Sequence, residues 1–429
     1  MKRRLSQRLV LAAAVFLAIS TFGRVAHSED ARVLPAGVGR FSFVYAETSG
    51  VNDQFDADGN RESITAPYNV ELNAKTLKAA DPNGMGALIN SLNQVHPVLK
   101  TPAGDTLDLG TLNTSAQVME TQENVGFQYG ITDRLTIGFN VPIVQVNTTL
   151  NASLTGTNTA QNLAADFAQP GLPTQVSPVG ANLQKLAAAN VEAIRELLQT
   201  AGYNVPQNTT QQGIGDIVFG GRYNYYRSHY ENVLSSVQAG LSAPTGSIHD
   251  PSNPTQIDLG NGAWGIGVAH VFNYSPFHFL TLSNGLHYTH YLPASRNELV
   301  QDFGSESLLP PMSDKQDVTF QPGDRYEANL GADFHLNRAI TLSGAYDWWW
   351  KKQDSYSGSD SNGNYGALSF WTNEYLESVQ AGISVSSIEA FKRKSFPIPC
   401  DAAFNIYIPR VGRNAPIGPY GTLSLDLYI

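Results

Sequence analysis

The sequence predicts an all-β protein, a transmembrane antiparallel β-barrel of about 12 strands with long extracellular loops and one loop helix. Three observations lead to this fold class. Apolar and polar residues alternate in many short segments, the connections between these segments alternate between long and short, and only 15% of the 429 residues are charged. Soluble domains usually carry about 25% charged residues. Outside the N-terminus, no apolar run approaches the ~18 to 20 residues that a spanning helix needs.

The first residues predict export. Basic residues among the first eight positions are followed by an apolar run over 9–19 and by the small-x-small pattern Ala26-His27-Ser28. This order is typical of a secretory signal peptide, which is too short to anchor a protein in a membrane. We therefore expect residues 1–28 to be a Sec signal peptide and residues 29–429 to form a barrel in a bacterial outer membrane.

Period-2 alternation is the main signal in the mature chain. In the segment 339–350, Leu342 and Tyr346 lie on one face, and Ser343 and Asp347 lie on the other. Most such segments match the ~9 to 11 residues with which a tilted strand crosses a bilayer. Twelve strands are predicted in this way: 40–47, 118–129, 134–146, 215–226, 232–243, 263–273, 277–291, 324–335, 339–350, 374–387, 402–408 and 420–429.

The connections between these strands predict their orientation. The odd-numbered connections run 70, 68, 19, 32, 23 and 11 residues, and the even-numbered ones run 4, 5, 3, 3 and 14. Outer-membrane barrels have short periplasmic turns, long extracellular loops, an even number of strands and both termini in the periplasm. The short strand 402–408 and the 14-residue turn before it leave the strand count open between ten and fourteen.

Two long outer loops, 48–117 and 147–214, hold much of the chain, and we expect substrate choice to reside there. Within the second loop, Leu183, Leu186 and Leu198 belong to an apolar stripe with helical spacing over 182–201. This is the one predicted loop helix. Packing on the outer loops and partial filling of the barrel mouth are both open for it.

The C-terminus and the aromatic clusters fit the same architecture. Leu423, Leu425 and Leu427 alternate with polar residues up to the terminal Ile429. The barrel-assembly machinery recognises a final strand of this kind, although its usual last residue is Phe. The clusters Trp348-Trp349-Trp350 and Tyr223 to Tyr226 are predicted to lie at the two membrane interfaces, where amphipathic rings collect.

The charge balance excludes some partners. The chain has 37 Asp+Glu against 27 Lys+Arg, a net charge of −10. Removing residues 1–28 takes away five basic residues and no acidic one, so 22 remain against 37, a formal −15. Acidity of this size argues against nucleic acid as a partner. We expect outer-membrane lipids and lipopolysaccharide, the barrel-assembly machinery and a small organic substrate as partners. Cys400 is the single cysteine, so no intrachain disulfide can form.

Several motifs resemble a known family. They are Tyr129-Gly-Ile-Thr-Asp-Arg-Leu-Thr-Ile-Gly-Phe-Asn-Val141, Gly213-Ile-Gly-Asp-Ile-Val-Phe-Gly-Gly-Arg-Tyr223, Pro244-Thr-Gly246 before Leu259-Gly-Asn-Gly262, and Leu34-Pro-Ala-Gly37. Together they resemble the outer-membrane transporters named for the meta pathway of phenol degradation, which are related in outline to long-chain fatty acid transporter barrels. The resemblance covers most strands from about residue 34 onward. It implies passage of hydrophobic or aromatic compounds across the outer membrane.

An enzyme of lipase type is the main alternative from another class. The segment Ser283-Asn284-Gly285 resembles the nucleophile region of the outer-membrane phospholipase, in which a histidine two residues earlier activates the serine. Thr281 occupies that position here. Without a base, a serine hydroxyl is a poor nucleophile at neutral pH. We therefore expect no catalytic residue.

Metal sites also find little support. His270, His278, His287 and His290 are close in sequence, but their spacing matches no zinc pattern. The segment 56–60, Asp-Ala-Asp-Gly-Asn, imitates part of a calcium loop but lacks the acids at the first and twelfth positions. We expect a polar turn at 56–60, scattered lumen or interface histidines, and no metal or cofactor.

The charged residues opposite the apolar positions are predicted to line the lumen. Buried charges must either pair with one another or contact water. A polar wall of mixed sign suits an outer-membrane channel for passive uptake of small organic compounds, with hydrophobic and aromatic compounds as candidates. A lipase-type enzyme and a structural or surface barrel without transport are the alternatives. The predicted lumen-lining residues are Arg134, Asp216, Arg222, Arg325, Glu327, Asp333, His335 and Asp347.

Overall fold

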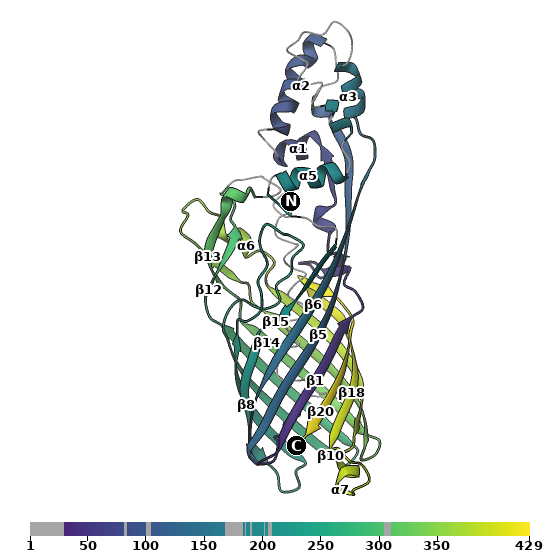
Figure 1. Cartoon of the computed structure of the whole chain (residues 1–429), viewed down its shortest axis with the longest axis vertical. Coiled ribbons are helices and arrows are strands. Elements are labelled where there is room, and N and C mark those ends of the chain that lie inside the picture. Colours follow the sequence, from purple (N-terminus) through teal and green to yellow (C-terminus); the bar gives the residue numbers. More distant parts are fainter. Residues whose placement is uncertain are drawn as a thin grey trace.

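A closed barrel of twelve antiparallel strands forms the body of the protein, as predicted (Figure 1). The computed structural model describes residues 30–80, 84–99, 104–167, 183–184, 186–188, 191–200, 202–204, 208–303 and 310–429. The barrel strands are β1 (Gly39–Thr48), β5 (Asp108–Thr132), β6 (Leu135–Thr155), β8 (Ile217–Arg227), β9 (Val233–Ala243), β10 (Gly265–Phe277), β11 (Leu280–Tyr291), β14 (Arg325–His335), β15 (Ile340–Lys351), β17 (Glu374–Ser386), β18 (Cys400–Arg413) and β20 (Tyr420–Tyr428).

Strand β1 closes the barrel by pairing on both of its edges. Arg40 is the register partner of Tyr428 in the last strand and of Gln128 in β5. Apart from this pairing of the first strand with the last, all neighbouring barrel strands are consecutive along the chain once the loop strands are set aside. Because the sheet closes on itself, no strand edge is left unpaired in the bilayer.

The predicted alternation defines the two faces of the wall. Phe41, Phe139, Phe219 and Leu425 are exposed on the outer surface. Their neighbours along each strand are buried inside. The hydrophobicity of the chain therefore forms an outward apolar belt, which is the surface that a transmembrane barrel presents to lipid.

The hairpin of β5 and β6 is much longer than predicted. Its pairing runs from Thr132 and Leu135 at the inner turn to Thr111 and Thr155 far beyond the barrel. The predicted strands 118–129 and 134–146 were therefore too short at their outer ends. Residues 147–155 were predicted as part of the outer loop 147–214, but Thr is a good strand former and the two strands stabilise each other by continued pairing. Strands β4 (Val70–Asn73) and β7 (Asn208–Ile214) pair with this extension.

Several helices pack around the hairpin tip, so the prediction of a single loop helix was wrong. They are α1 (Ala74–Ala80), α2 (Met85–Leu99), α3 (Ala160–Phe167) and α5 (Val191–Thr200) (Figure 1). Helices α1, α2 and α3 share one apolar cluster, whose buried residues include Ala74, Ile89, Leu92, Leu107, Leu163 and Leu183. Tertiary contacts with the hairpin stabilise these short helices, and this support is not visible in local sequence.

Helix α5 covers the second half of the predicted helix 182–201, and residues 182, 185, 189, 190 and 201 of that prediction lie outside the described residues. Among the described helices, none combines the length and the apolar character needed to cross a membrane.

The remaining outer loops form two small sheets and short helical turns. One sheet contains β12 (Ala294–Leu299), β13 (Lys315–Gln321) and β16 (Ser355–Ser357), and the other contains β19 (Ala415–Ile417), β2 (Asp53–Phe55) and β3 (Arg61–Ser63). The helical turns are η3 (Ala66–Tyr68), η4 (Gly104–Thr106), η6 (Met312–Asp314) and α6 (Tyr365–Leu368). At the opposite end of the barrel the turns are short, apart from the one that contains α7 (Ile388–Lys392) (Figure 1).

Candidate functional site

The inward faces of the strands form a polar lumen. Asn124 and Asn140 are buried on facing strands, and the Asn140 amide donates to Asn124 Oδ1 over 3.0 Å. Between β17 and β18, the Gln380 amide donates to Asn405 Oδ1 over 3.1 Å. Such bonds compensate for the loss of water around these groups.

Charged side chains also join the first and last strands inside the lumen. Arg40 Nη1 lies 3.3 Å from Asp426 Oδ2, and Arg40 Nη2 donates to Gln128 Oε1 over 2.7 Å. The Tyr428 hydroxyl donates to Asp401 Oδ2 over 2.7 Å. The barrel is therefore closed by side-chain contacts as well as by the backbone ladder.

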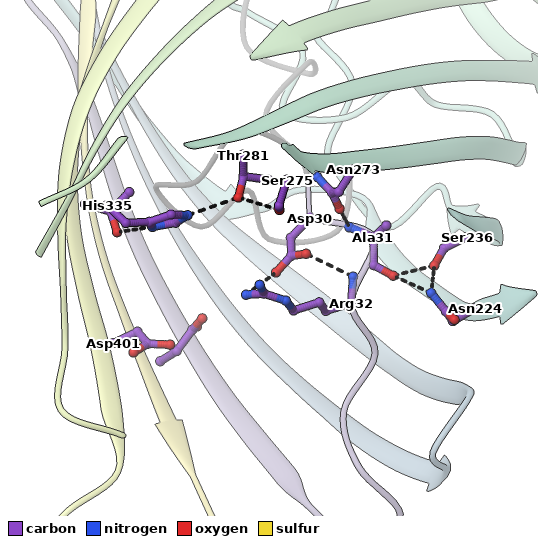
Figure 2. A network of polar contacts seen from close by, with 12 residues as sticks. Asp30, Ala31, Arg32, Asn224, Ser236, Asn273, Ser275, Thr281, His335 and Asp401 are labelled. Carbon is purple, nitrogen blue, oxygen red and sulfur yellow. Dashed lines mark hydrogen bonds and ion pairs between the residues drawn. The ribbon is translucent and has the colours of Figure 1, made fainter. Parts of the chain in front are cut away.

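The segment 30–38 threads into the inner half of the lumen, where polar side chains of the wall bind its backbone (Figure 2). Ala31 is fully buried; its N–H donates to Asn273 Oδ1, and its carbonyl accepts from Ser236 Oγ and, over 3.3 Å, from Asn224 Nδ2. Further along, the Leu34 N–H donates to Thr136 Oγ1 over 2.8 Å. This segment narrows the inner end of the barrel.

Arg222 fastens the same segment from one wall. Its Nη1 donates to the carbonyl oxygens of Asp30 and, over 3.1 Å, of Arg32. The sequence predicted Arg222 as a lumen residue but did not predict that a segment of the backbone would occupy the lumen. No local pattern in residues 30–38 indicates this, because the contacts connect them to strands about 100 to 240 residues away.

A cavity of about 390 Å³ remains between this segment and the barrel wall. Five predicted lumen residues line it: Arg222, Arg325, Glu327, Asp333 and His335. His335 is held in place by Thr281 and Thr341, each with its hydroxyl oxygen 3.0 Å from an imidazole nitrogen. Figure 2 shows His335 and Thr281 beside the N-terminal segment.

One stretch of the wall of this inner cavity is made of glycines. Gly138, Gly220, Gly240 and Gly267 lie in register on the neighbouring strands β6, β8, β9 and β10. Each follows an outward residue, such as Phe219 before Gly220, so each faces inward. All four line the cavity. We call these four residues the glycine row. The period-2 pattern could have revealed it, since each glycine occupies an inward position of a predicted strand.

A second cavity, of about 300 Å³, lies under the outer loops. Much of its wall is apolar, from side chains that include Leu112, Leu150, Tyr203, Phe320, Pro322 and Trp349. Asn261, Tyr291 and Arg325 line both cavities, so the two spaces adjoin at these residues. The outer and inner cavities thus lie in series along the barrel.

Arg325 lies at this junction in a fixed position. Its Nε is 3.2 Å from Glu327 Oε1, and its guanidinium lies 4.5 Å from the ring centroid of Trp349. Its Nη2 is buried and has no hydrogen-bond partner among the described residues. Trp349 faces inward, on the face of β15 where the alternation predicted it together with Asp347, and Trp350 is exposed on the outward face. The prediction of an interfacial cluster therefore does not hold for Trp349.

The other predicted lumen residues have different positions. Asp216 is buried just before β8 and accepts from the backbone N–H groups of Gly246 at 3.0 Å and Asn261 at 2.6 Å, so it holds the loop between β9 and β10. Asp347 is buried in the wall and accepts from Asn329 Nδ2 over 2.7 Å. Arg134 does not face the lumen: it lies exposed in the turn between β5 and β6, because the strands end before it.

The residues of the enzyme and metal hypotheses are not assembled into a site. Ser283 is buried on an inward position of β11, and its hydroxyl has no hydrogen-bond partner among the described residues. His290 faces Asp324, with Nδ1 2.7 Å from Oδ1, and His270 lies 2.9 Å from the Tyr225 hydroxyl. The described part of the chain holds no group of three or more His, Cys, Asp or Glu side chains arranged for a metal ion.

Asp56 caps the polar turn expected at 56–60 by accepting from the N–H groups of Asp58 and Asn60.

A buried ionic cluster stabilises the loops above the outer cavity. His249 Nδ1 lies 2.6 Å from Asp258 Oδ1, and Arg296 lies 3.5 Å from Asp258 and 2.6 Å from Glu298. Burial disfavours the charged imidazole, but the hydrogen bond and the charge of Asp258 outweigh it and raise the pKa of His249. Burial likewise opposes ionisation of Asp258, yet the His249 contact and Arg296 lower its pKa.

The loop between β9 and β10 should therefore loosen at alkaline pH. A raised His249 pKa means that its stabilising contribution is complete below the ordinary value of 6.5 and is lost as the pH rises through the raised value. Asp258 contributes above its ordinary value of 3.8 and loses that contribution only as the pH falls through the lowered one. We expect amide exchange of residues 244–262, corrected for intrinsic rates, to accelerate as the pH rises above 6.5 through the raised pKa of His249.

His249→Gln should flatten this pH dependence. Amide hydrogen exchange of the glycine row, measured in the same samples, is the control, and its corrected rate should not change with pH or with the substitution. An unaltered pH profile in the variant would refute the assignment to His249.

The N-terminal segment should leave the lumen when its anchors are removed. The double substitution Asn224→Ala and Ser236→Ala leaves the Ala31 carbonyl without its two donors, which costs about 1 to 3 kcal/mol for a buried group. In a Cys400→Ser background, Ala31→Cys should react slowly with a thiol reagent and react much faster after the double substitution. Ala36→Cys, which is exposed, should react rapidly in both proteins. Slow labelling at position 31 in both would contradict the anchoring role.

Comparison with known proteins supports the fold. No family model matches the sequence, so the resemblance to the meta-pathway transporters stays a prediction. No curated protein matches either. The structure resembles the COG4313 outer membrane channel from Pseudomonas putida F1, with a TM-score of 0.50, 11% identity, and coverage of 93% of this chain and 98% of that chain.

Two more distant structures also align. The Pseudomonas putida toluene transporter TodX has a TM-score of 0.35 and 11% identity, covering 92% of this chain and 90% of that chain. A Pseudomonas aeruginosa FadL homologue has a TM-score of 0.32 and 9% identity, covering 97% of each. Both likenesses are too distant to carry an argument. The comparisons thus establish that this chain has a β-barrel fold similar to that of an outer membrane channel.

Proposed function

We propose that this protein is an outer-membrane channel for passive uptake of small neutral organic compounds, hydrophobic or aromatic ones in particular. The observation that carries the proposal is the pair of adjoining cavities inside a closed barrel, the outer one largely apolar and the inner one bordered by the glycine row. The COG4313 protein that shares the fold is an outer membrane channel, which agrees with a transport role. Residence among outer-membrane lipids and lipopolysaccharide, and insertion by the barrel-assembly machinery, stay predictions.

The charges around the outer cavity favour neutral compounds. Its wall includes four acidic side chains, Asp258, Glu298, Asp354 and Glu374, and five basic ones, Arg195, His249, Arg296, Arg325 and Lys351. Most of them pair within the wall: Lys351, for example, lies 2.8 Å from Asp354 and 3.7 Å from Glu374. Charges that are paired within the wall attract a further ion only weakly, so the apolar walls determine what binds.

Catalysis plays no part in this proposal. Ser283 lies inside the barrel wall, whereas a lipase must present its nucleophile to lipid together with a base. We therefore infer that the protein acts on its substrate only by binding and release, and that it needs no cofactor.

Blocking the glycine row tests the transport path. Gly267→Phe adds a ring to the inner cavity, and its Cβ would meet nothing closer than Thr289 Oγ1 at 3.6 Å, so the barrel should still fold. We expect uptake of toluene by cells with an intact lipopolysaccharide layer to fall several-fold towards the rate of cells without the protein.

The matched control is Gly344→Phe, on the outward face of β15, where the Cβ would meet nothing closer than Gln380 O at 3.9 Å. It should leave uptake unchanged, and both variants should show the heat-dependent gel mobility of a folded barrel. Equal uptake by Gly267→Phe and the unmodified protein would refute a path along this wall.

Charge selectivity tests the proposed class of substrate. Toluene and benzoate share a ring, but benzoate has a carboxylate in place of the methyl group. Most charges of the outer cavity are already paired within its wall, as Lys351 is with Asp354, whereas its apolar side chains remain open to a ring. We expect the protein to increase the rate of toluene uptake by cells and to leave benzoate uptake at neutral pH unchanged. A comparable increase for benzoate would contradict selection by the apolar walls.

A further inference from the structure

The connection between β17 and β18 differs from every other inner turn of the barrel. The turns 133–134, 228–232, 278–279 and 336–339 have two to five residues, whereas this connection spans 387–399 and contains α7. A barrel needs only a tight turn here, because β17 and β18 are adjacent and antiparallel. The additional residues therefore serve something other than closure of the wall.

This connection satisfies its backbone by internal hydrogen bonds and exposes apolar side chains. The Ser387 hydroxyl donates to the Ile398 carbonyl over 2.7 Å and accepts from the Cys400 N–H at 2.8 Å, and the Ser395 hydroxyl donates to the Ala390 carbonyl over 3.0 Å. In contrast, Phe391, Phe396 and Ile398 are 42%, 44% and 50% exposed. The backbone is thus satisfied internally, and the apolar side chains face away from the protein.

The same connection is basic in an acidic protein. Lys392, Arg393 and Lys394 are consecutive and exposed, and the only acid in the connection is Glu389. Glu389 already has two cationic neighbours, Lys392 at 3.1 Å and Arg338 of the adjacent turn at 3.9 Å. For Arg393 and Lys394, no ion pair is present within the described part of the chain. We name these exposed residues, 391–398, the basic foot.

We propose that the basic foot binds anionic phospholipid headgroups in the inner leaflet of the outer membrane. Its apolar side chains continue the lipid-facing belt, since Ile398 precedes β18, whose Phe404 and Ile406 are exposed outward, and Val385 is exposed at the facing end of β17. Apolar rings inserted at headgroup level beside flexible cations form the usual pattern of an interfacial lipid contact. The periplasmic position of this end follows from the short turns and from the C-terminus beside it.

Native mass spectrometry of the full-length protein in detergent, titrated with phosphatidylglycerol or phosphatidylethanolamine, tests this proposal. The unmodified protein should bind phosphatidylglycerol more tightly. The triple substitution Lys392→Gln, Arg393→Gln and Lys394→Gln should abolish the preference and weaken phosphatidylglycerol binding at least about fivefold, the contribution expected of one cation near an anionic lipid surface. Lys75→Gln with Lys78→Gln, on α1 beyond the outer end, is the matched control and should retain the preference.

A second pair of substitutions separates charge from insertion. Phe391→Ser with Phe396→Ser should weaken binding of both lipids while the preference for phosphatidylglycerol survives. Heat-dependent gel mobility should show that every variant is folded, and toluene uptake should be unchanged, which keeps this proposal separate from the transport function. Equal binding of the two lipids by the unmodified protein, or an undiminished preference in the triple variant, would overturn it. If the protein binds isolated peptidoglycan through the basic foot and shows no lipid preference, the proposal is overturned in favour of a cell-wall contact.

Discussion

Satisfaction of backbone hydrogen bonds without water is the constraint on which the rest of this structure depends. A sheet in a bilayer can have no free edge, and β1 meets this condition by pairing with β5 on one side and β20 on the other. Closure then separates two environments, because consecutive residues of every strand must face lipid and lumen alternately. The same short segments therefore supply an apolar exterior and a polar interior.

The polar interior also explains how a stretch of backbone can enter the barrel. The segment 30–38 forms no strand inside the lumen, so its peptide groups need partners from elsewhere. Asn224, Ser236 and Asn273 provide them at Ala31, and Arg222 provides two more donors. An apolar lumen could not hold this segment, since each unsatisfied peptide group would cost free energy. The polar lumen thus holds a segment of backbone where a simple pore would have open space.

Ion pairing makes the lumen polar without giving it a strong charge. Arg40 lies against Asp426, Arg325 against Glu327, and Lys351 against Asp354 and Glu374. Paired charges fix side chains and define the shape of the wall, but they attract ions weakly. The open volume is then shaped by residues without charge, the glycine row in the inner cavity and the apolar loop residues in the outer one. This division connects the fold to uptake of neutral compounds.

The sequence by itself determined the barrel, its twelve strands, the inward and outward faces and the position of the short turns, because alternation and turn spacing are local properties of the chain. It also predicted five residues that the structure places around the inner cavity: Arg222, Arg325, Glu327, Asp333 and His335.

Only the tertiary structure decided the rest. It placed residues 30–38 in the lumen, aligned four glycines from different strands, brought the Arg325 guanidinium against the Trp349 ring, and extended the β5 and β6 hairpin into a helical cap. These features depend on contacts between residues far apart in sequence and on the register between strands. Periodicity within a single strand contains no information about which residues of its neighbours lie beside it.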